Sequence, residues 1–73
     1  MDNFSTRLKE LRLEMGLSQK KLAEIFDNKI TQQAIDLWER EKRDIKLSYA
    51  IMLAKFFDVS LDYLAGLSDE YKK

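Results

Sequence analysis

Residues 31–39, Thr31-Gln32-Gln33-Ala34-Ile35-Asp36-Leu37-Trp38-Glu39, decide how this chain folds. Thr31 is a good residue to begin a helix, because its hydroxyl can accept a hydrogen bond from a backbone N–H of the first turn. Ile35 and Trp38 are three residues apart and therefore share one face of a helix. We predict a helix from Thr31 to about Glu39 that Ile35 and Trp38 hold to a core.

A second short helix precedes this one. Ser18 is a good N-cap, and the helix after it spans about two turns. The sequence Asp-Asn-Lys-Ile at 27–30 breaks the helical pattern and is typical of a turn. The inward-facing residues of this helix are expected to be Leu22, Ala23 and Phe26.

Three more helices complete the chain. The first begins after Asn3 or Ser5 and ends before Gly16, which supplies a left-handed cap. The last is a short helix between the N-cap Ser60 and Gly66. Apolar residues at helical spacing mark the first helix at Leu8, Leu11 and Met15, the fourth at Leu47, Ala50, Ile51, Leu53, Ala54 and Phe57, and the fifth at Leu64.

The predicted fold is all-α: a compact five-helix domain over residues 1–67, followed by a short charged tail over 68–73. Within it, two short helices joined by a tight turn form a helix-turn-helix. A small protein can rest the first of two such helices across a phosphate backbone and place the second in the major groove of DNA.

The composition excludes several classes of function. The 73 residues include no cysteine and no histidine, which removes disulfides, thiolate and imidazole catalysis and the usual zinc sites. No spacing suggests a paired acid and base or a glycine loop for phosphate. We expect a protein that is not an enzyme and needs no metal or cofactor. Because no apolar run has membrane-spanning length and the amino terminus does not resemble a signal peptide, we also expect no membrane contact and a cytoplasmic location.

Charge is balanced overall and uneven locally. The chain has 13 basic and 13 acidic residues, whereas nucleic-acid-binding domains are usually basic. Residues 40–46 nevertheless hold four basic and two acidic side chains. The carboxylates of the C-terminal part are Asp58, Asp62, Asp69 and Glu70. The sequence therefore predicts a polarised molecule.

Several motifs together resemble the phage repressor and Cro family, the XRE-type helix-turn-helix proteins. They cover roughly residues 5–67: Leu17-Ser18-Gln19 to Leu22-Ala23, Thr31 to Ile35, Trp38-Glu39-Arg40, Lys42-Arg43, and the run from Leu53 to Leu64. The resemblance implies a five-helix domain that binds double-stranded DNA, usually as a homodimer on a near-palindromic operator. It also implies an internal ion pair between Arg12 and Glu39.

The same resemblance places the front of the helix that begins at Thr31 against base edges. Gln33, Asp36, Leu37 and Arg40 fall opposite Ile35 and Trp38, and Gln32 lies in the exposed first turn. A glutamine amide matches the adenine edge, Leu37 could touch a thymine methyl group, and Asp36 could accept from cytosine or bond a neighbouring side chain. The expected backbone contacts are Gln19, Lys20, Arg40, Lys42 and Arg43. The alternative for the exposed helix residues is an ordinary solvated face.

This chain departs from the family pattern at three places. The turn at 27–30 is longer than is typical, and Glu41 stands where glycine is common, so the chain there either becomes left-handed or leaves the helix differently. Leu13, Ile25, Tyr49 and Met52 are apolar where relatives are usually polar. If they cluster, they would form a dimer seam or a docking patch for a protein regulator.

Two functions remain open on the sequence. The first is a sequence-specific transcriptional regulator, a phage-type or mobile-element repressor that occupies its operator as a dimer. The second is a protein-interaction module, such as an antitoxin or an adaptor, in which the helix-turn-helix is mainly a scaffold. Because the net charge is zero, we expect a single domain to bind DNA weakly, and dimerisation would compensate for this.

Overall fold

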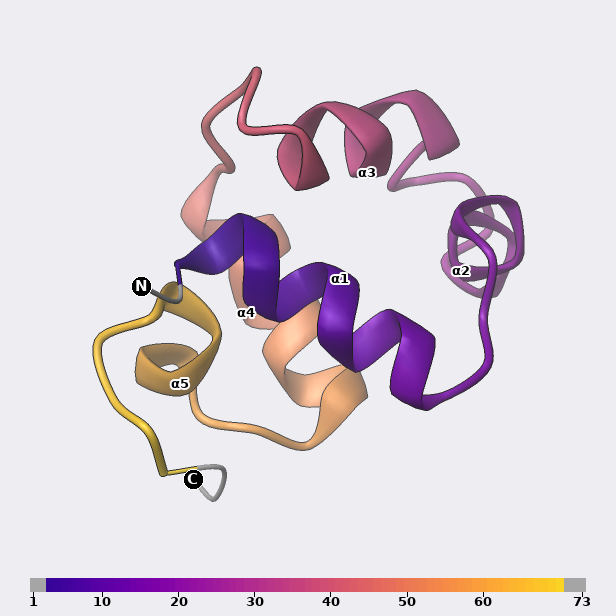
Figure 1. Ribbon diagram of the computed structural model, residues 1–73. Coiled ribbons are helices and arrows are strands. Elements are labelled where there is room, and N and C mark those ends of the chain that lie inside the picture. Colours follow the sequence, from indigo (N-terminus) through magenta and orange to yellow (C-terminus); the bar gives the residue numbers. More distant parts are fainter. Residues whose placement is uncertain (1–2, 71–73) are drawn as a thin grey trace.

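A computed structural model describes residues 3–70 of the chain, and these contain five helices and no strand. The helices are α1 (Phe4–Glu14), α2 (Gln19–Ile25), α3 (Gln32–Glu39), α4 (Leu47–Phe57) and α5 (Leu61–Ala65). In Figure 1, α1 crosses the molecule with α3 above it, α2 at one end, α5 near the other and α4 behind. The predicted all-α, five-helix fold is confirmed.

Side-chain caps begin four of the five helices. The hydroxyls of Ser18, Thr31 and Ser60 accept from the backbone N–H three residues later at 3.0, 3.1 and 2.9 Å, as the sequence predicted. The carboxamide of Asn3 accepts from Thr6 N at 3.0 Å, so α1 takes the earlier of its two predicted starts. Lys46 precedes α4 without a side-chain cap.

All five helices end in the same type of turn. At each end one residue is left-handed, with φ between 54° and 83°, and its N–H and the next one bond back to carbonyls of the last turn. The glycines predicted to end α1 and α5 take this position. The five left-handed residues are Gly16, Asp27, Glu41, Asp58 and Gly66.

All five helices contribute to the core, and the α2–α3 turn adds Ile30 to it. Its fully buried side chains are Leu8, Leu22, Ile30, Ile35, Leu53 and Leu64. Three apolar residues predicted to face the core do not. Met15, Leu47 and Ile51 are 51%, 65% and 37% exposed. Met15 lies after the last turn of α1, and Leu47 and Ile51 form the outer edge of α4, one turn apart.

Arg7 joins the first helix to the C-terminal part of the chain. Its guanidinium lies 3.9 Å from the ring centre of Tyr63 and donates to the carbonyl oxygens of Tyr63 at 3.0 Å and Ser68 at 2.8 Å. It also pairs with the exposed carboxylate of Asp69 at 2.8 Å. The first residues of the predicted tail therefore contact the domain. Residues 71–73 lie outside the described part, and the domain boundary after 67 stays a prediction.

Candidate nucleic-acid interface

α2 and α3 contact each other, and α2 carries a small buried residue. Ala23 is 1% exposed. The turn between the helices passes through two left-handed residues, Asp27 and Asn28, with φ of 54° and 61°. Short polar side chains tolerate this conformation better than most. Ile30 then returns the chain to the core, so the long turn is anchored at its end.

α3 is held to the molecule along its inner face. Ile35 is fully buried and Trp38 is 3% exposed, as predicted. The hydroxyl of Ser5 in α1 donates to the carbonyl of Trp38, which fixes the end of α3. The Trp38 ring packs against Phe4 at 6.4 Å and Tyr49 at 5.9 Å between ring centres. The position of α3 is therefore set by α1 and α4 together.

A nearly buried ion pair joins α1 to α3. Arg12 donates from Nε and Nη2 to the two carboxylate oxygens of Glu39 at 2.7 and 2.9 Å, and from Nη1 to the carbonyl of Leu17 at 2.8 Å. The side chains of Arg12 and Glu39 are 9% and 3% exposed. The hydrogen bonds to Glu39 raise the pKa of Arg12, and burial opposes them. The predicted ion pair is confirmed.

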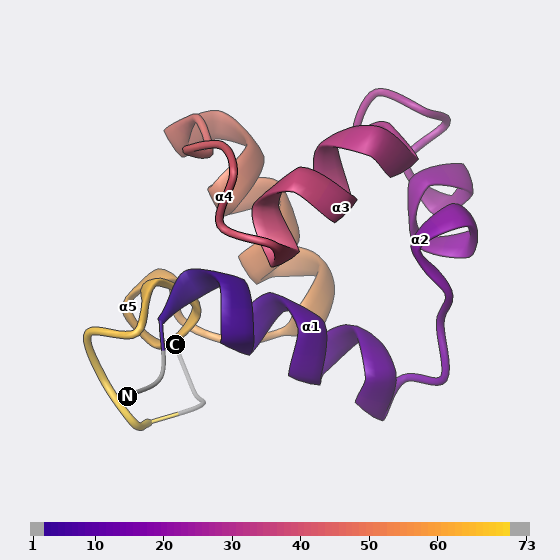
Figure 2. The ribbon, with the colours of Figure 1, turned by 45° about the horizontal axis from the view of Figure 1, so that its top comes forward.

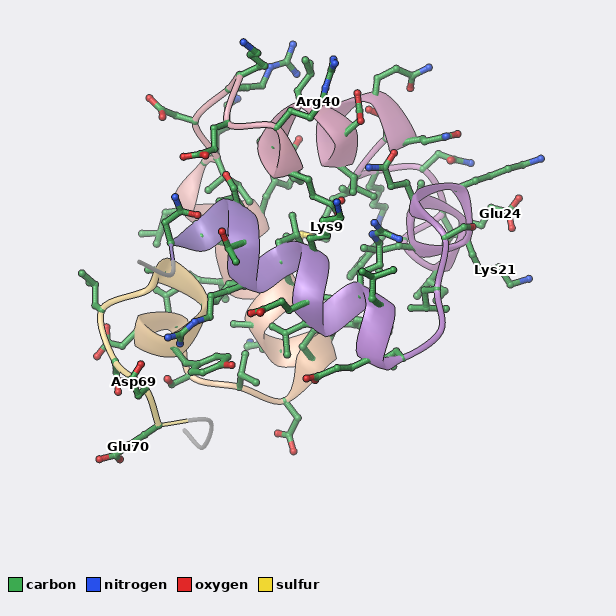
Figure 3. All side chains as sticks on the ribbon, in the orientation of Figure 1. Lys9, Lys21, Glu24, Arg40, Asp69 and Glu70 are labelled. Atoms are coloured by element: carbon green, nitrogen blue, oxygen red, sulfur yellow. The ribbon has the colours of Figure 1, made fainter. Side chains whose placement is uncertain are left out.

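The outer face of α3 carries the predicted base-contacting residues. Gln32 and Gln33 are exposed in its first turn, and Arg40, a predicted backbone contact, is exposed at its end. Figure 3 shows Arg40 on the outer surface of α3. Asp36 and Leu37 are half-buried, so they present less surface than the glutamines do.

Asp36 takes part in a network with its neighbours. The side-chain nitrogen of Gln19 donates to Glu39 at 3.1 Å and lies 3.4 Å from a carboxylate oxygen of Asp36. The other carboxylate oxygen of Asp36 pairs with Arg40 at 3.1 Å. This geometry favours bonding to neighbouring side chains over the cytosine contact for Asp36. It also ties Gln19 to α3.

A hollow of about 440 Å³ lies where α2 meets the start of α3. Lys20, Gln32 and Gln33 line it together, which brings a predicted backbone contact beside two predicted base contacts. Asn28 lines the same hollow and was missed by the sequence reading. An asparagine in a turn is sufficiently explained by its conformation, so nothing in the sequence marked it as a surface for a ligand.

The loop after α3 carries the remaining predicted contacts. Lys42 and Arg43 are exposed, and Glu41 before them is left-handed with φ of 59°. The side chain of Asn3 donates to Glu41 at 2.9 Å and ties this loop to the start of α1. Arg43 shares a cavity with Lys29 and Lys46, two cations that the sequence reading did not select.

Two of the four residues of the proposed apolar seam pack against the core of the same molecule. Tyr49 and Met52 pack against the core, whereas Leu13 and Ile25 are 56% and 44% exposed. Tyr49 and Met52 are therefore only partly exposed, and the seam stays a prediction. The helical period could not show this, because the ring of Tyr49 packs against Trp38 of another helix.

These features define a class: an all-helical domain whose third helix is braced from behind and presents exposed polar side chains, Gln32 and Gln33, in its first turn. Comparison with known proteins agrees, since a family model described as helix-turn-helix matches residues 8–64. The chain belongs to the XRE/Cro/CI-type helix-turn-helix family of DNA-binding transcriptional regulators, which is not an enzyme family. Among the described residues, no helix combines the length and the apolar character that crossing a membrane requires.

Individual relatives carry regulator names. The HTH-type transcriptional regulator ImmR of Bacillus subtilis is 36% identical over 71 residues, which cover 97% of this chain and 54% of ImmR. The uncharacterised HTH-type transcriptional regulator YobD of the same organism is 33% identical over 67 residues, covering 92% of this chain and 58% of YobD. A Rickettsia conorii homologue, also an uncharacterised HTH-type transcriptional regulator, is 31% identical over 74 residues, which cover 99% of this chain and 58% of the homologue. The chain thus spans little more than half the length of these relatives.

Proposed function

We propose that this domain is a sequence-specific repressor of the phage type, which places α3 in the major groove of its operator and blocks transcription by occupying it. The exposed first turn of α3 carries the proposal. Gln32 and Gln33 project from a helix whose other face is fixed by Ile35 and Trp38. A helix braced in this way loses little conformational freedom when it enters the groove.

Each side chain has a defined role in this proposal. Gln32 and Gln33 read adenine edges, and Leu37 contacts a thymine methyl group. Asp36 orients Gln19 and Arg40. Its carboxylate also disfavours DNA sequences that place a hydrogen-bond acceptor of a base edge against it. Phosphate contacts come from Gln19, Lys20, Arg40, Lys42 and Arg43, which position the domain without reading sequence.

The proposal includes a homodimer on a near-palindromic operator. A chain with no net charge makes few net favourable phosphate contacts, so a second linked domain adds affinity that one domain lacks. The Cα atoms extend over 28 × 23 × 22 Å, so two touching copies fit half-sites about 34 Å apart, one turn of DNA. A regulator of this kind works where the chromosome is, and we therefore place it in the cytoplasm.

The test begins by selecting bound fragments from random DNA and measuring their affinity by fluorescence anisotropy. Changing Gln33 to Ala should cost about 1–3 kcal/mol against the preferred base pair and relax preference at that position alone. Changing Lys42 to Ala should weaken binding to all sequences alike. The spacing of half-sites in the selected fragments reports the dimer.

The competing function is a protein-interaction module that uses the fold as a scaffold. It is favoured by exposed apolar residues away from α3, such as Leu13 and Leu67, which are 56% and 80% exposed. Under that reading neither Gln33→Ala nor Lys42→Ala alters DNA binding, and random DNA yields no enriched sequence. That result would reject the repressor proposal.

A further inference from the structure

Three side-chain amides surround the hollow where α2 meets the start of α3. They belong to Asn28 of the α2–α3 turn and to Gln32 and Gln33 of the first turn of α3. In Figure 2 this turn projects as a loop beside the start of α3. All three residues are exposed. Asn28 therefore shares one surface with the two glutamines to which the proposed function assigns base reading.

The backbone of the turn holds Asn28 in place. Asn28 is left-handed with φ of 61°, and its N–H donates to the carbonyl of Ala23 at 3.0 Å. The N–H groups on either side of it also donate to carbonyl oxygens at the end of α2, each at 3.0 Å. Ile30 closes the turn with a side chain that is 1% exposed. A side chain carried by a turn fixed in this way loses little freedom when it binds a ligand.

The carboxamide of Asn28 is not used within the described part of the chain. The side-chain amide of Gln19 is occupied, because it donates to Glu39 at 3.1 Å. Within residues 3–70 the side chain of Asn28 forms no hydrogen bond, and neither do those of Gln32 and Gln33. A carboxamide carries two donor hydrogens and an acceptor oxygen. Those of Asn28 are all available to a ligand.

The charges that line the hollow indicate which part of DNA it suits. Lys20 contributes one positive charge and Glu24 one negative charge, so the lining has no net charge. A phosphate group offers only acceptors and is attracted by net positive charge. The edge of an adenine instead offers a donor and an acceptor side by side. A neutral lining with three amides therefore suits base edges better than phosphate.

We propose that Asn28 is a third base-reading residue, which forms paired hydrogen bonds with an adenine in the major groove. Asparagine, like glutamine, can bond N6 and N7 of adenine together. Because the turn precedes α3, this adenine lies next to the base pair that Gln32 reads, on the side away from Leu37. The inference rests on the proposed function and extends the reading surface from α3 into the turn before it. The longer turn at 27–30 thus adds one base pair to the half-site.

The test compares the DNA that the full chain selects from random fragments with the DNA that Asn28→Gly selects. Glycine keeps the left-handed conformation and removes the carboxamide, so the turn should persist. We expect the preference for adenine at one position to fall by roughly 5- to 150-fold, and the preferences due to Gln32 and Gln33 to stay unchanged. Asp27→Gly is the matched control, since Asp27 is an exposed left-handed residue of the same turn that does not line the hollow.

A modified base identifies the atom that Asn28 contacts. In 7-deazaadenine a carbon replaces the acceptor N7, so placing it at the new position should weaken binding by the wild-type chain in fluorescence anisotropy. The Asn28→Gly variant should bind the modified and the unmodified DNA equally. Circular dichroism verifies that both turn variants fold.

The inference is overturned if Asn28→Gly selects the same sequence as the wild type while Gln33→Ala still changes one position, and the proposed function survives that result. It is also overturned if Asn28→Gly weakens binding to all sequences alike, because Asn28 would then contact the phosphate backbone. If the wild-type chain enriches no sequence from random DNA, the proposed function fails and the inference fails with it.

Discussion

Glu41 occupies the least suitable backbone conformation in the described chain. Of the five left-handed residues that end the helices, two are glycines and two are aspartates, which tolerate that region better than most residues. Glu41 has a longer side chain, and only its hydrogen bond from Asn3 at 2.9 Å acts in its favour. This exposed bond is worth little, so the turn after α3 is strained.

Replacing Glu41 with Gly should therefore stabilise the domain. The left-handed conformation costs an ordinary residue about 1–2 kcal/mol, and glycine relieves this strain. Glycine also loses more backbone entropy on folding, which offsets about 0.5–1 kcal/mol of that gain. We expect the free energy of unfolding to rise by about 0.5–1 kcal/mol and Tm by roughly 2–8 °C in a thermal melt. Glu41→Ala is the control: it keeps the Cβ and loses the bond from Asn3, so an equal gain from Ala would contradict the explanation.

At the scale of elements, the ion pair between Arg12 and Glu39 is the strongest polar link between α1 and α3. Its hydrogen bonds raise the pKa of Arg12 in the folded state. A basic group whose pKa is higher in the folded state contributes its full stabilisation at pH values below its unfolded-state pKa. This contribution is lost only as the pH rises through its folded-state pKa. For an arginine both values lie in strong alkali, so the contribution of Arg12 does not vary across the physiological range.

Removing one partner of this pair should be far more damaging than removing both. Glu39→Leu leaves the Arg12 charge buried and should cost about 3–5 kcal/mol, a large part of the stability of a small domain. Arg12→Met combined with Glu39→Leu should recover much of that loss in urea unfolding. Arg40→Ala, which breaks the exposed pair with Asp36, should cost at most about 1 kcal/mol. Equal losses in the single and double variants would contradict this account.

Helix boundaries could be predicted because they depend on local chemistry. Ser18, Thr31 and Ser60 cap helices whose first turns follow directly in the sequence, and Gly66 ends one. Burial was harder, because the helical period indicates which residues share a face and not how far the opposing helices extend. Leu47 has the right spacing for the core and is 65% exposed at the edge of α4.

The candidate interface also combines features that the sequence could predict with features that it could not. The exposure of Gln32 and Gln33 follows from the period of a single helix, and the link of Arg12 to Glu39 was implied by the family resemblance. The contacts of Gln32 and Gln33 with DNA remain predictions. Lys29 and Lys46 lie 17 positions apart in the sequence, and only the folded chain places them around one cavity. Sequence patterns within one helix carry no information about such a site.

At the scale of the whole molecule, large apolar side chains are exposed on several elements, and two of them lie one turn apart on α4. Figure 3 places Arg40 at the top of the view and Asp69 and Glu70 at the lower left, and the predicted polarity of the whole molecule stays a prediction. The outer edge of α4 exposes Leu47 and Ile51, and Ile51 also lines a hollow of about 240 Å³. The other residues that line this hollow are Ala54, Lys55, Val59, Ser60 and Leu61.

We expect this edge of α4 to be the seam between two copies in the proposed dimer. Changing Leu47 to Ser and Ile51 to Lys should shift the protein toward monomer in sedimentation at micromolar concentration and weaken operator binding through lost avidity. Both side chains are already exposed, so the fold should change little. Leu13→Ser with Ile25→Lys is the matched control on α1 and α2. Loss of association in the control pair alone would move the seam there.

The division of α3 into a bracing face and a presenting face has a consequence for engineering. Ile35, Trp38 and Glu39 fix the helix through contacts with α1 and α4, and none of them belongs to the outer surface. Gln32 and Gln33 can therefore be exchanged for the corresponding residues of another regulator without rebuilding the domain. Asp36 is the exception, because its bonds reach Gln19 and Arg40. A graft that changes Asp36 has to bring its own partners from both helices.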